Sequence, residues 1–224
     1  MSREAEKQRA VLLLGSFFLP AGIFFSVLIF QGFFPNGTKT TLFMDLKGQY
    51  TEFLASLRYI FHGDDTLFFS WSRAMGGNAL GLYAYYTGGI LSFLSCIFPV
   101  SKIWLAVEIL EILEVGLCGL SFAIFLEWGV KKKTESFGVI IFSACYALMS
   151  YNMVYTCCFM WIDGCIMLPL IMLGIEKIFQ GKKGLLFYIF LSVAMISNYY
   201  TAYMICIFSV FYVLFRCTRY LCEQ

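Results

Sequence analysis

The sequence predicts an all-α polytopic membrane protein with about six membrane-crossing helices. Hydrophobic residues make up 60% of the 224-residue chain and charged residues only 13%, which lies outside the balance of soluble domains. Residues 10–34 carry no charge and would reach ~37 Å as a helix, enough to cross a hydrocarbon core of ~30 Å. We therefore expect a single transmembrane domain over residues 1–224.

The basic residues set the expected order and direction of the helices. Short cytoplasmic loops collect Lys and Arg, so we place the N-terminus and every basic cluster in the cytoplasm. The clusters are Arg3/Lys7/Arg9, Lys131/Lys132/Lys133, Lys182/Lys183 and Arg216/Arg219. Crossings are then expected at residues 10–34, about 103–128, 136–156 and 164–179, alternately outward and inward.

The last apolar stretch predicts a helical hairpin. Residues 185–215 carry no charge and would reach ~46 Å as one helix, which is too long for one crossing, and both flanks are basic. Two short limbs that turn near Ser197–Tyr200 fit better. Unsatisfied polar groups cannot face lipid, so the turn at Asn198 should line a protein cavity or reach the outer interface.

The segment 35–102 is expected to form a long first extracellular loop. Within it, apolar residues recur at the three- and four-residue spacing of an amphipathic helix, at Leu46, Tyr50, Phe53, Leu54, Leu57 and Phe61. This helix should begin at Asp45, end near His62–Gly63 and lie on the outer membrane face. Residues 88–100 are short, end beyond Pro99 and would invert the later helices if they crossed, so we expect an interfacial or re-entrant segment.

Two charged residues of the loop are candidates for chemistry. Asp45 follows the first crossing, where its carboxylate can act as a general base in a cleft or cap the N-terminus of the amphipathic helix. Arg73 can grip a phosphate with two parallel hydrogen bonds, or make an ordinary head-group or carboxylate contact. The nearby Gly76-Gly77-Asn78 is typical of a turn.

Acidic residues inside the crossings offer a second set of candidates. Asp163 lies beside Trp161 at the outer end of a crossing, where it can hold a substrate hydroxyl or a cation, or be a solvated turn residue. Glu108, Glu111 and Glu114 share one face of the second crossing. They form either a proton or cation path or a set of groups that face the bundle, protonated or paired with bases.

Several chemistries are excluded or unsupported. His62 is the only histidine, so we expect neither a Ser-His-Asp triad nor a multi-histidine metal site without another chain. The nine cysteines lack metal-site spacing, and buried, unpaired thiols are expected. No basic, aromatic pattern indicates a nucleic-acid partner.

Taken in order, several motifs resemble the start of the bacterial YfhO-type membrane proteins, which belong to the broad GT-C class of polytopic glycosyltransferases. The motifs are Asp45…Gln49-Tyr50, Trp71-Ser72…Gly77-Asn78, Ala84-Tyr85-Tyr86, Tyr146-Ala147-Leu148, Trp161-Ile162-Asp163, Pro169-Leu170, Gly174-Ile175-Glu176 and Asn198-Tyr199-Tyr200. Proteins of that family are several times longer, so the chain is expected to correspond to their N-terminal part.

The resemblance implies a function in the bacterial cytoplasmic membrane. A sugar would pass from a polyprenyl-phosphate donor to a cell-envelope polymer of the teichoic or lipoteichoic acid type, on the extracellular face. Asp45 would be the catalytic residue, and no cofactor is expected, with a divalent cation left open. Substrate-binding roles are expected for Gln49, Tyr50, Arg73, Asn78, Tyr85, Tyr86, Asp163 and Asn198.

In this interpretation Asp45 and Arg73 flank one pocket that opens to lipid chains, and Arg73 stabilises the leaving phosphate. Two other functions stay open. The glutamates and the broken final hairpin are also typical of a transporter or flippase for a lipid-linked substrate. The third alternative is a non-catalytic membrane assembly subunit.

Overall fold

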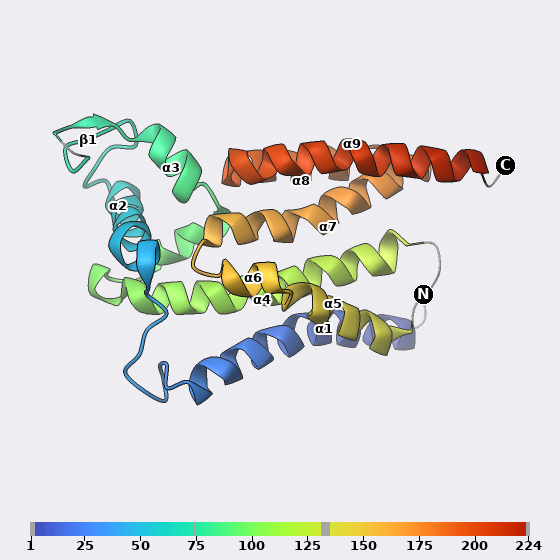
Figure 1. Ribbon diagram of the computed structural model, residues 1–224, viewed down its shortest axis with the longest axis horizontal. Coiled ribbons are helices and arrows are strands. Elements are labelled where there is room, and N and C mark those ends of the chain that lie inside the picture. The colour runs from blue at the N-terminus through green and yellow to red at the C-terminus, as the bar shows by residue number, and fades with distance from the viewer. Residues whose placement is uncertain (1–2, 74, 131–134, 223–224) are drawn as a thin grey trace.

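The protein, seen in a computed structural model that describes residues 3–73, 75–130 and 135–222, is a bundle of long helices with an elaborate cap at one end (Figure 1). The long and medium helices are α1 (Arg3–Phe30), α4 (Ile103–Trp128), α5 (Ser136–Ala147), α7 (Phe159–Phe179), α8 (Leu185–Ser197) and α9 (Tyr199–Cys222). The shorter elements are π-helix η1 (Leu46–Tyr50), α2 (Thr51–His62), β1 (Phe69–Ser70), β2 (Gly77–Asn78), α3 (Leu80–Tyr86), 3-10 helices η2 (Ile90–Ile97) and η3 (Val100–Lys102), and α6 (Ser150–Val154).

The predicted all-α polytopic fold is confirmed. Within the described residues, four helices are long and apolar enough to cross a membrane, or five if the bent pair α3 and η2 counts as one crossing. The four comprise residues 6–30, 100–128, 159–179 and 199–219. The other two predicted crossings are helical but short, because α5 and α8 have 12 and 13 residues and reach only ~18–20 Å.

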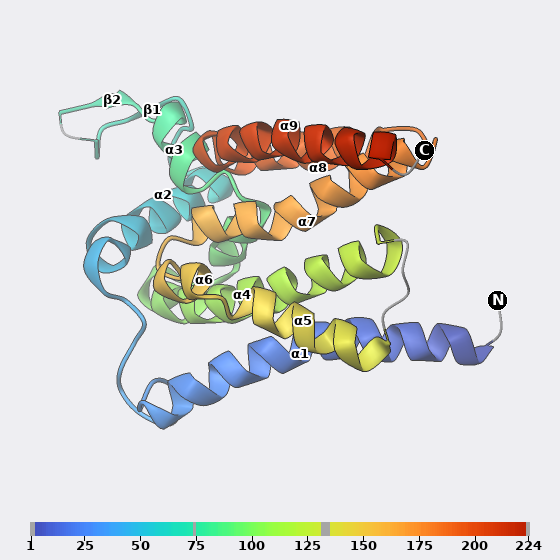
Figure 2. The same ribbon diagram turned by 45° about the vertical axis from the view of Figure 1, so that its right-hand side comes forward.

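The final hairpin turns where the sequence predicts. Helix α8 ends at Ser197 and α9 begins at Tyr199, and the two lie side by side (Figures 1 and 2). The expectation of two short limbs holds for α8 and is wrong for α9, which has 24 residues.

Helix α4 is the centre of the bundle and packs against α1, α5 and α7. Small residues allow the closest approach: a Cβ atom added to Gly119 would stand 2.2 Å from the Ser16 carbonyl oxygen, and one at Gly116 would stand 2.6 Å from Phe17. Gly174 of α7 is equally close to the Phe187 backbone of α8. Contact of this kind between small residues drives helix association in membranes, where apolar burial contributes little.

Helices η1 and α2 form the predicted amphipathic helix, which lies across the end of the bundle where α1 ends and α4 begins (Figure 1). Its buried face packs on α4 and the start of α7 through Leu46, Tyr50 and Leu54, all at most 6% exposed. The helix ends at His62, and Gly63 with a φ of +86° caps its last turn.

The segment after α2 folds as a small antiparallel pair of strands followed by α3 and η2. Ser70 pairs with Gly77 and Phe69 with Asn78. Helices α3 and η2 meet at an angle of 101°, the geometry of a broken crossing or a re-entrant loop. Both stay near the α2 end of the bundle in Figures 1 and 2, in agreement with the predicted re-entrant or interfacial segment.

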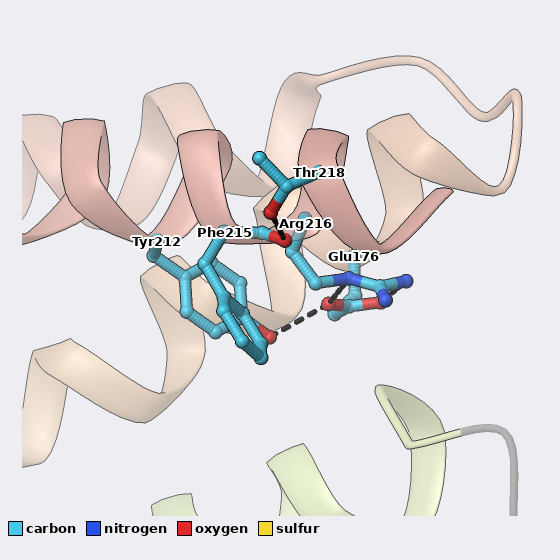
Figure 3. Close-up of polar contacts among 5 residues, drawn as sticks. All are labelled: Glu176, Tyr212, Phe215, Arg216 and Thr218. Atoms are coloured by element: carbon cyan, nitrogen blue, oxygen red, sulfur yellow. Dashed lines mark hydrogen bonds and ion pairs between the residues drawn. The ribbon is translucent and has the colours of Figure 1, made fainter. Parts of the chain in front are cut away.

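The opposite end of the bundle is fastened by a buried ion pair (Figure 3). The Nε and Nη2 atoms of Arg216 on α9 lie 2.6 and 3.0 Å from the two carboxylate oxygens of Glu176 on α7. Tyr212 donates a further hydrogen bond of 2.6 Å to Glu176, and the guanidinium lies over the Phe179 ring. Arg9 and Glu127 join α1 to α4 at this same end of the molecule, at 3.3 Å.

All described basic clusters gather at that end. Figure 1 shows the N-terminus, the turn between α7 and α8 that carries Lys182 and Lys183, and the C-terminus of α9 on the same side. The Lys131–Lys133 cluster lies outside the described residues. The alternating direction of α1, α4, α5, α7, α8 and α9 therefore agrees with the order derived from charge.

Candidate functional site

The candidate site lies at the capped end of the bundle and begins with Asp45. Its carboxylate is exposed and makes no capping hydrogen bond, so the capping alternative is wrong. The helix instead starts in a π-helical turn, after Met44 in a left-handed conformation (φ 48°). The Asp45 carboxylate therefore does not cap the helix and is open to solvent.

Gln49, Tyr50 and Tyr86 form the immediate surroundings of Asp45. The Gln49 side chain hydrogen-bonds Tyr86, and the charge of Asp45 acts on both tyrosines. Tyr50 is 6% exposed, and its hydroxyl lies 3.8 Å from the sulfur of Cys158. Burial, then Cys158, and then Asp45 raise the pKa of Tyr50, so that it stays a neutral hydrogen-bonding phenol.

An aromatic wall continues from these tyrosines towards α7 and α9. The ring of Tyr86 lies 4.7 Å from those of Phe53 and Tyr85, measured between ring centres. Trp161 donates a 3.4 Å hydrogen bond to the Tyr85 hydroxyl, and the Tyr199 ring lies 5.6 Å from that of Tyr85. Aromatic faces of this kind can pack on a sugar ring or an isoprenoid chain.

Asn198 holds the aromatic wall in place through the backbone of Tyr85. It is fully buried, its Nδ2 donates to the Tyr85 carbonyl oxygen at 2.9 Å, and its Oδ1 accepts from the Thr201 backbone N–H at 2.9 Å. The polar turn between α8 and α9 is thus satisfied inside the protein, as its sequence requires. Its substrate-binding role would be indirect, through Tyr85.

Arg73 lies in a different neighbourhood. It lines a cavity of about 410 Å³ between α2, the strand pair and α3, and Asp45 does not line that cavity. The expectation that the two residues flank one pocket is therefore wrong. Asn78 is exposed, and its Oδ1 accepts a 2.9 Å hydrogen bond from the Leu80 backbone, so it begins α3 as a turn residue does.

Asp163 is inside α7 and only 4% exposed, which excludes the solvated-turn alternative. Its Oδ2 stands against the backbone of Gly89, where an added Cβ would lie 1.9 Å away. A Cβ atom added to Gly88 would lie 2.4 Å from the Ile196 carbonyl oxygen. The bend between α3 and η2 is therefore seated directly on α7 and on the end of α8.

Glu108, Glu111 and Glu114 face the bundle and are at most 4% exposed. Glu108 and Glu111 meet Thr41 of the outer loop, and Glu114 is next to Asp163. Neither oxygen of Glu114 has a hydrogen-bond partner, and within the described residues no base pairs with any of the three. No described cluster of acids, histidines or cysteines has the geometry of a metal site.

The sequence analysis missed several polar groups of the cavity around Arg73, namely Glu52, Ser56, Asp65 and Ser70. One signal was present. Glu52, Ser56 and Tyr59 recur at four- and three-residue spacing on the polar face of the amphipathic helix, and only the apolar face was interpreted. The contribution of Asp65 and Ser70 depends on the strand pair, which has no periodic pattern.

The fold and site define a multi-spanning helical membrane protein with its polar groups gathered at one end of the bundle. Residues 16–224 match the family described as bacterial membrane protein YfhO, and the chain belongs to this family. It is 27% identical over 173 residues to "Uncharacterized protein YfhO" of Bacillus subtilis (strain 168). That match covers 69% of this chain and 19% of the relative, so the chain spans about a fifth of the relative's length. No solved structure matches the chain.

Proposed function

We propose that this membrane domain serves a glycosyltransferase that moves a sugar from a polyprenyl-phosphate donor to a teichoic or lipoteichoic acid-type polymer. The observation that carries the proposal is the exposed Asp45 carboxylate, held at one end of the bundle beside Gln49, Tyr50 and Tyr86. The family match over residues 16–224 also supports the proposal, because the resemblance to YfhO-type proteins then covers nearly the whole domain.

The chemistry assigns a role to each group. An acceptor hydroxyl attacks the anomeric carbon of the donor sugar, its proton passes to Asp45, and the bond to the lipid phosphate breaks. The lipid phosphate leaves with the bonding electron pair. The wall formed by Tyr85, Tyr86 and Trp161 packs on the sugar or on the first isoprene units, and Gln49 orients Tyr86.

The proposal includes an orientation. The described basic clusters lie at the end opposite Asp45, so the positive-inside rule puts the N-terminus in the cytoplasm and Asp45 on the extracellular face of the cytoplasmic membrane. Lipid-linked donors and envelope polymers meet on that face.

The test is Asp45→Asn in the native gene, with sugar substitution of the purified envelope polymer measured by NMR. General-base catalysis contributes about 10²–10⁴-fold, so we expect transfer to fall at least 100-fold. Asp64→Asn removes an exposed carboxylate of the same loop and is the matched control. Normal sugar content in the Asp45→Asn strain, with the protein at its usual level, would reject the proposal.

A second candidate function is favoured by the buried carboxyl groups on α4. Uncompensated carboxylates are costly to bury, so Glu111 and Glu114 bind protons or a transported cation in a transporter or flippase. Glu111→Gln in the same strain separates the two functions. Loss of polymer glycosylation in this variant alone, with Asp45→Asn unaffected, favours transport.

A further inference from the structure

The cavity around Arg73 has the features of a built binding site. It measures about 410 Å³ and lies between α2 and the outer segment that carries the strand pair. Ligand pockets in proteins typically measure about 300–1,000 Å³. Its polar lining comes from three separate parts of the chain: α2 (Glu52, Ser56), the strand region (Asp65, Ser70, Arg73) and α3 (Tyr83).

Two of its charged groups have no partner in the protein. Neither the Arg73 side chain nor the Glu52 side chain makes a hydrogen bond or ion pair with any described residue. Asp65 is partly engaged, because its Oδ1 accepts from the Thr66 backbone at 2.7 Å and its Oδ2 accepts from Ser70 at 3.4 Å. The cavity therefore presents one free cation and one free carboxylate to the same space.

The charge balance decides what kind of ligand fits. Two carboxylates and one guanidinium line the cavity, so its formal charge is −1. A phosphate bound at Arg73 would share the cavity with the carboxylates of Glu52 and Asp65. The three negative groups would repel one another. An uncharged polyol avoids this repulsion, since carboxylates accept hydrogen bonds from hydroxyl groups and a guanidinium donates to ring or hydroxyl oxygens.

The remaining lining agrees with a sugar. The hydroxyls of Ser56 and Tyr83 are paired at 2.5 Å and retain further donor or acceptor capacity. Phe53 and Tyr59 of α2 and Tyr83 of α3 supply aromatic surface to the cavity. A sugar ring offers the matching pair of surfaces, apolar C–H faces for aromatic rings and hydroxyls at the rim.

We infer that this cavity binds an uncharged sugar ring, with Glu52 and Arg73 as its main hydrogen-bonding groups. The inference deepens the proposed function and rests on it for the identity of the sugar, which is the transferred unit of the donor or a sugar of the acceptor. It also changes the role of Arg73, from a grip on the leaving lipid phosphate to recognition of the sugar.

The test is saturation-transfer NMR on the full chain in lipid nanodiscs. The probes are methyl α-glucoside, methyl N-acetyl-β-glucosaminide and glycerol 3-phosphate. We expect signal from at least one glycoside and none from glycerol 3-phosphate. Glu52→Gln and Arg73→Gln should each weaken glycoside binding at least tenfold, and Asp64→Asn should leave it unchanged.

A third cavity variant guards against misfolding. Ser72→Trp places a bulky side chain in the cavity from an exposed turn, and we expect it to abolish glycoside binding while the melting temperature stays unchanged. A short-chain prenyl-phosphate glucose that displaces the glycoside identifies the donor as the source of the sugar, and failure to displace it identifies the acceptor. Both results support the inference.

Binding of glycerol 3-phosphate in place of the glycosides would overturn the inference, as would unchanged glycoside binding in all three cavity variants. The experiment measures binding without turnover. A normal phenotype of Asp45→Asn therefore rejects the proposed transfer but leaves the sugar site standing, and loss of the sugar site leaves the Asp45 result unaffected.

Discussion

Asn198 and Tyr85 are 113 residues apart in the chain, yet the Nδ2 of Asn198 donates a 2.9 Å hydrogen bond to the Tyr85 carbonyl oxygen. The contact joins the break between α8 and α9 to α3 of the outer loop. It therefore couples the transmembrane bundle to the aromatic wall beside Asp45.

Asn198→Ala should lower the melting temperature in detergent and loosen α3. The substitution leaves the Tyr85 carbonyl oxygen and the Thr201 N–H without partners, which costs about 1–3 kcal/mol for each buried group. Asn198→Ser keeps an oxygen acceptor for Thr201 without a charge and should cost less. Equal stability of both variants and the parent would show that neither hydrogen bond matters.

Gly89→Ala should destabilise the protein by about 2 kcal/mol through overpacking. The backbone at Gly89 is extended (φ −69°, ψ 142°) and tolerates alanine, so the whole effect comes from the collision with the Asp163 carboxylate. Gly22→Ala is the control, because an added Cβ there meets nothing within 4 Å. Thermal unfolding of the double variant Gly89→Ala/Asp163→Ala should show partial rescue, and its absence would place the clash elsewhere.

Arg216→Met should destabilise the basic end of the bundle by about 3 kcal/mol, because it leaves the Glu176 carboxylate buried without a cation. This is the low end of the range for a buried pair, since the Arg216 side chain is 17% exposed. Replacing both partners, as Glu176→Leu/Arg216→Met, should restore most of the stability. A double variant as unstable as the single one contradicts this account; Lys183→Ala serves as a control.

Cys157 should resist alkylation at pH 8. Partial burial, and then the neighbouring Cys158, raise the pKa of Cys157 from 9.0 to about 12, so only about one molecule in 10⁴ carries the reactive thiolate. Exposed Cys222 should react with N-ethylmaleimide first, as read by mass spectrometry. Equal labelling of the two would refute the raised pKa of Cys157.

The same shift has a consequence for stability. Folding raises this pKa, so the folded state retains a proton that the unfolded chain loses near pH 9. The contribution of Cys157 to stability is fully present below that pH and is lost as the pH rises towards about 12. Chemical denaturation at pH 8 and pH 10.5 should show a decrease that Cys157→Ala reduces.

Fusions to alkaline phosphatase should report the orientation. A fusion after Gly63, beyond α2, should be active because it lies outside the cytoplasm, and a fusion after Gly181, in the turn between α7 and α8, should be inactive. The opposite pattern would invert the proposed orientation and remove Asp45 from the extracellular face.

The sequence was sufficient for those features that depend on local pattern. The charge-free run before residue 34, the amphipathic spacing around Leu54 and the position of the turn at Asn198 all follow from hydropathy and period, and all three are found in the structure. The thiols show the limit of composition. All nine are unpaired, as expected, but only Cys96 and Cys118 are buried, because a residue inside an apolar run can also lie on the outer surface of the bundle.

Features that depend on contacts between distant segments could not be predicted. The separation of Asp45 from Arg73 depends on how the strand pair folds over α2, and two-residue strands leave no periodic signal. The burial of Asp163 against Gly89 depends on the bend between α3 and η2. The identity of these residues could be read from the sequence, but their neighbours could not.

The two ends of the bundle differ in charge, and this gives them different roles. During synthesis, the insertion machinery responds to the cationic end, where Lys182, Lys183 and the Glu176–Arg216 bridge are found. The capped end carries none of the basic clusters among the described residues. Substitutions in its loops therefore leave the membrane orientation of the chain unchanged, so a new specificity can evolve there.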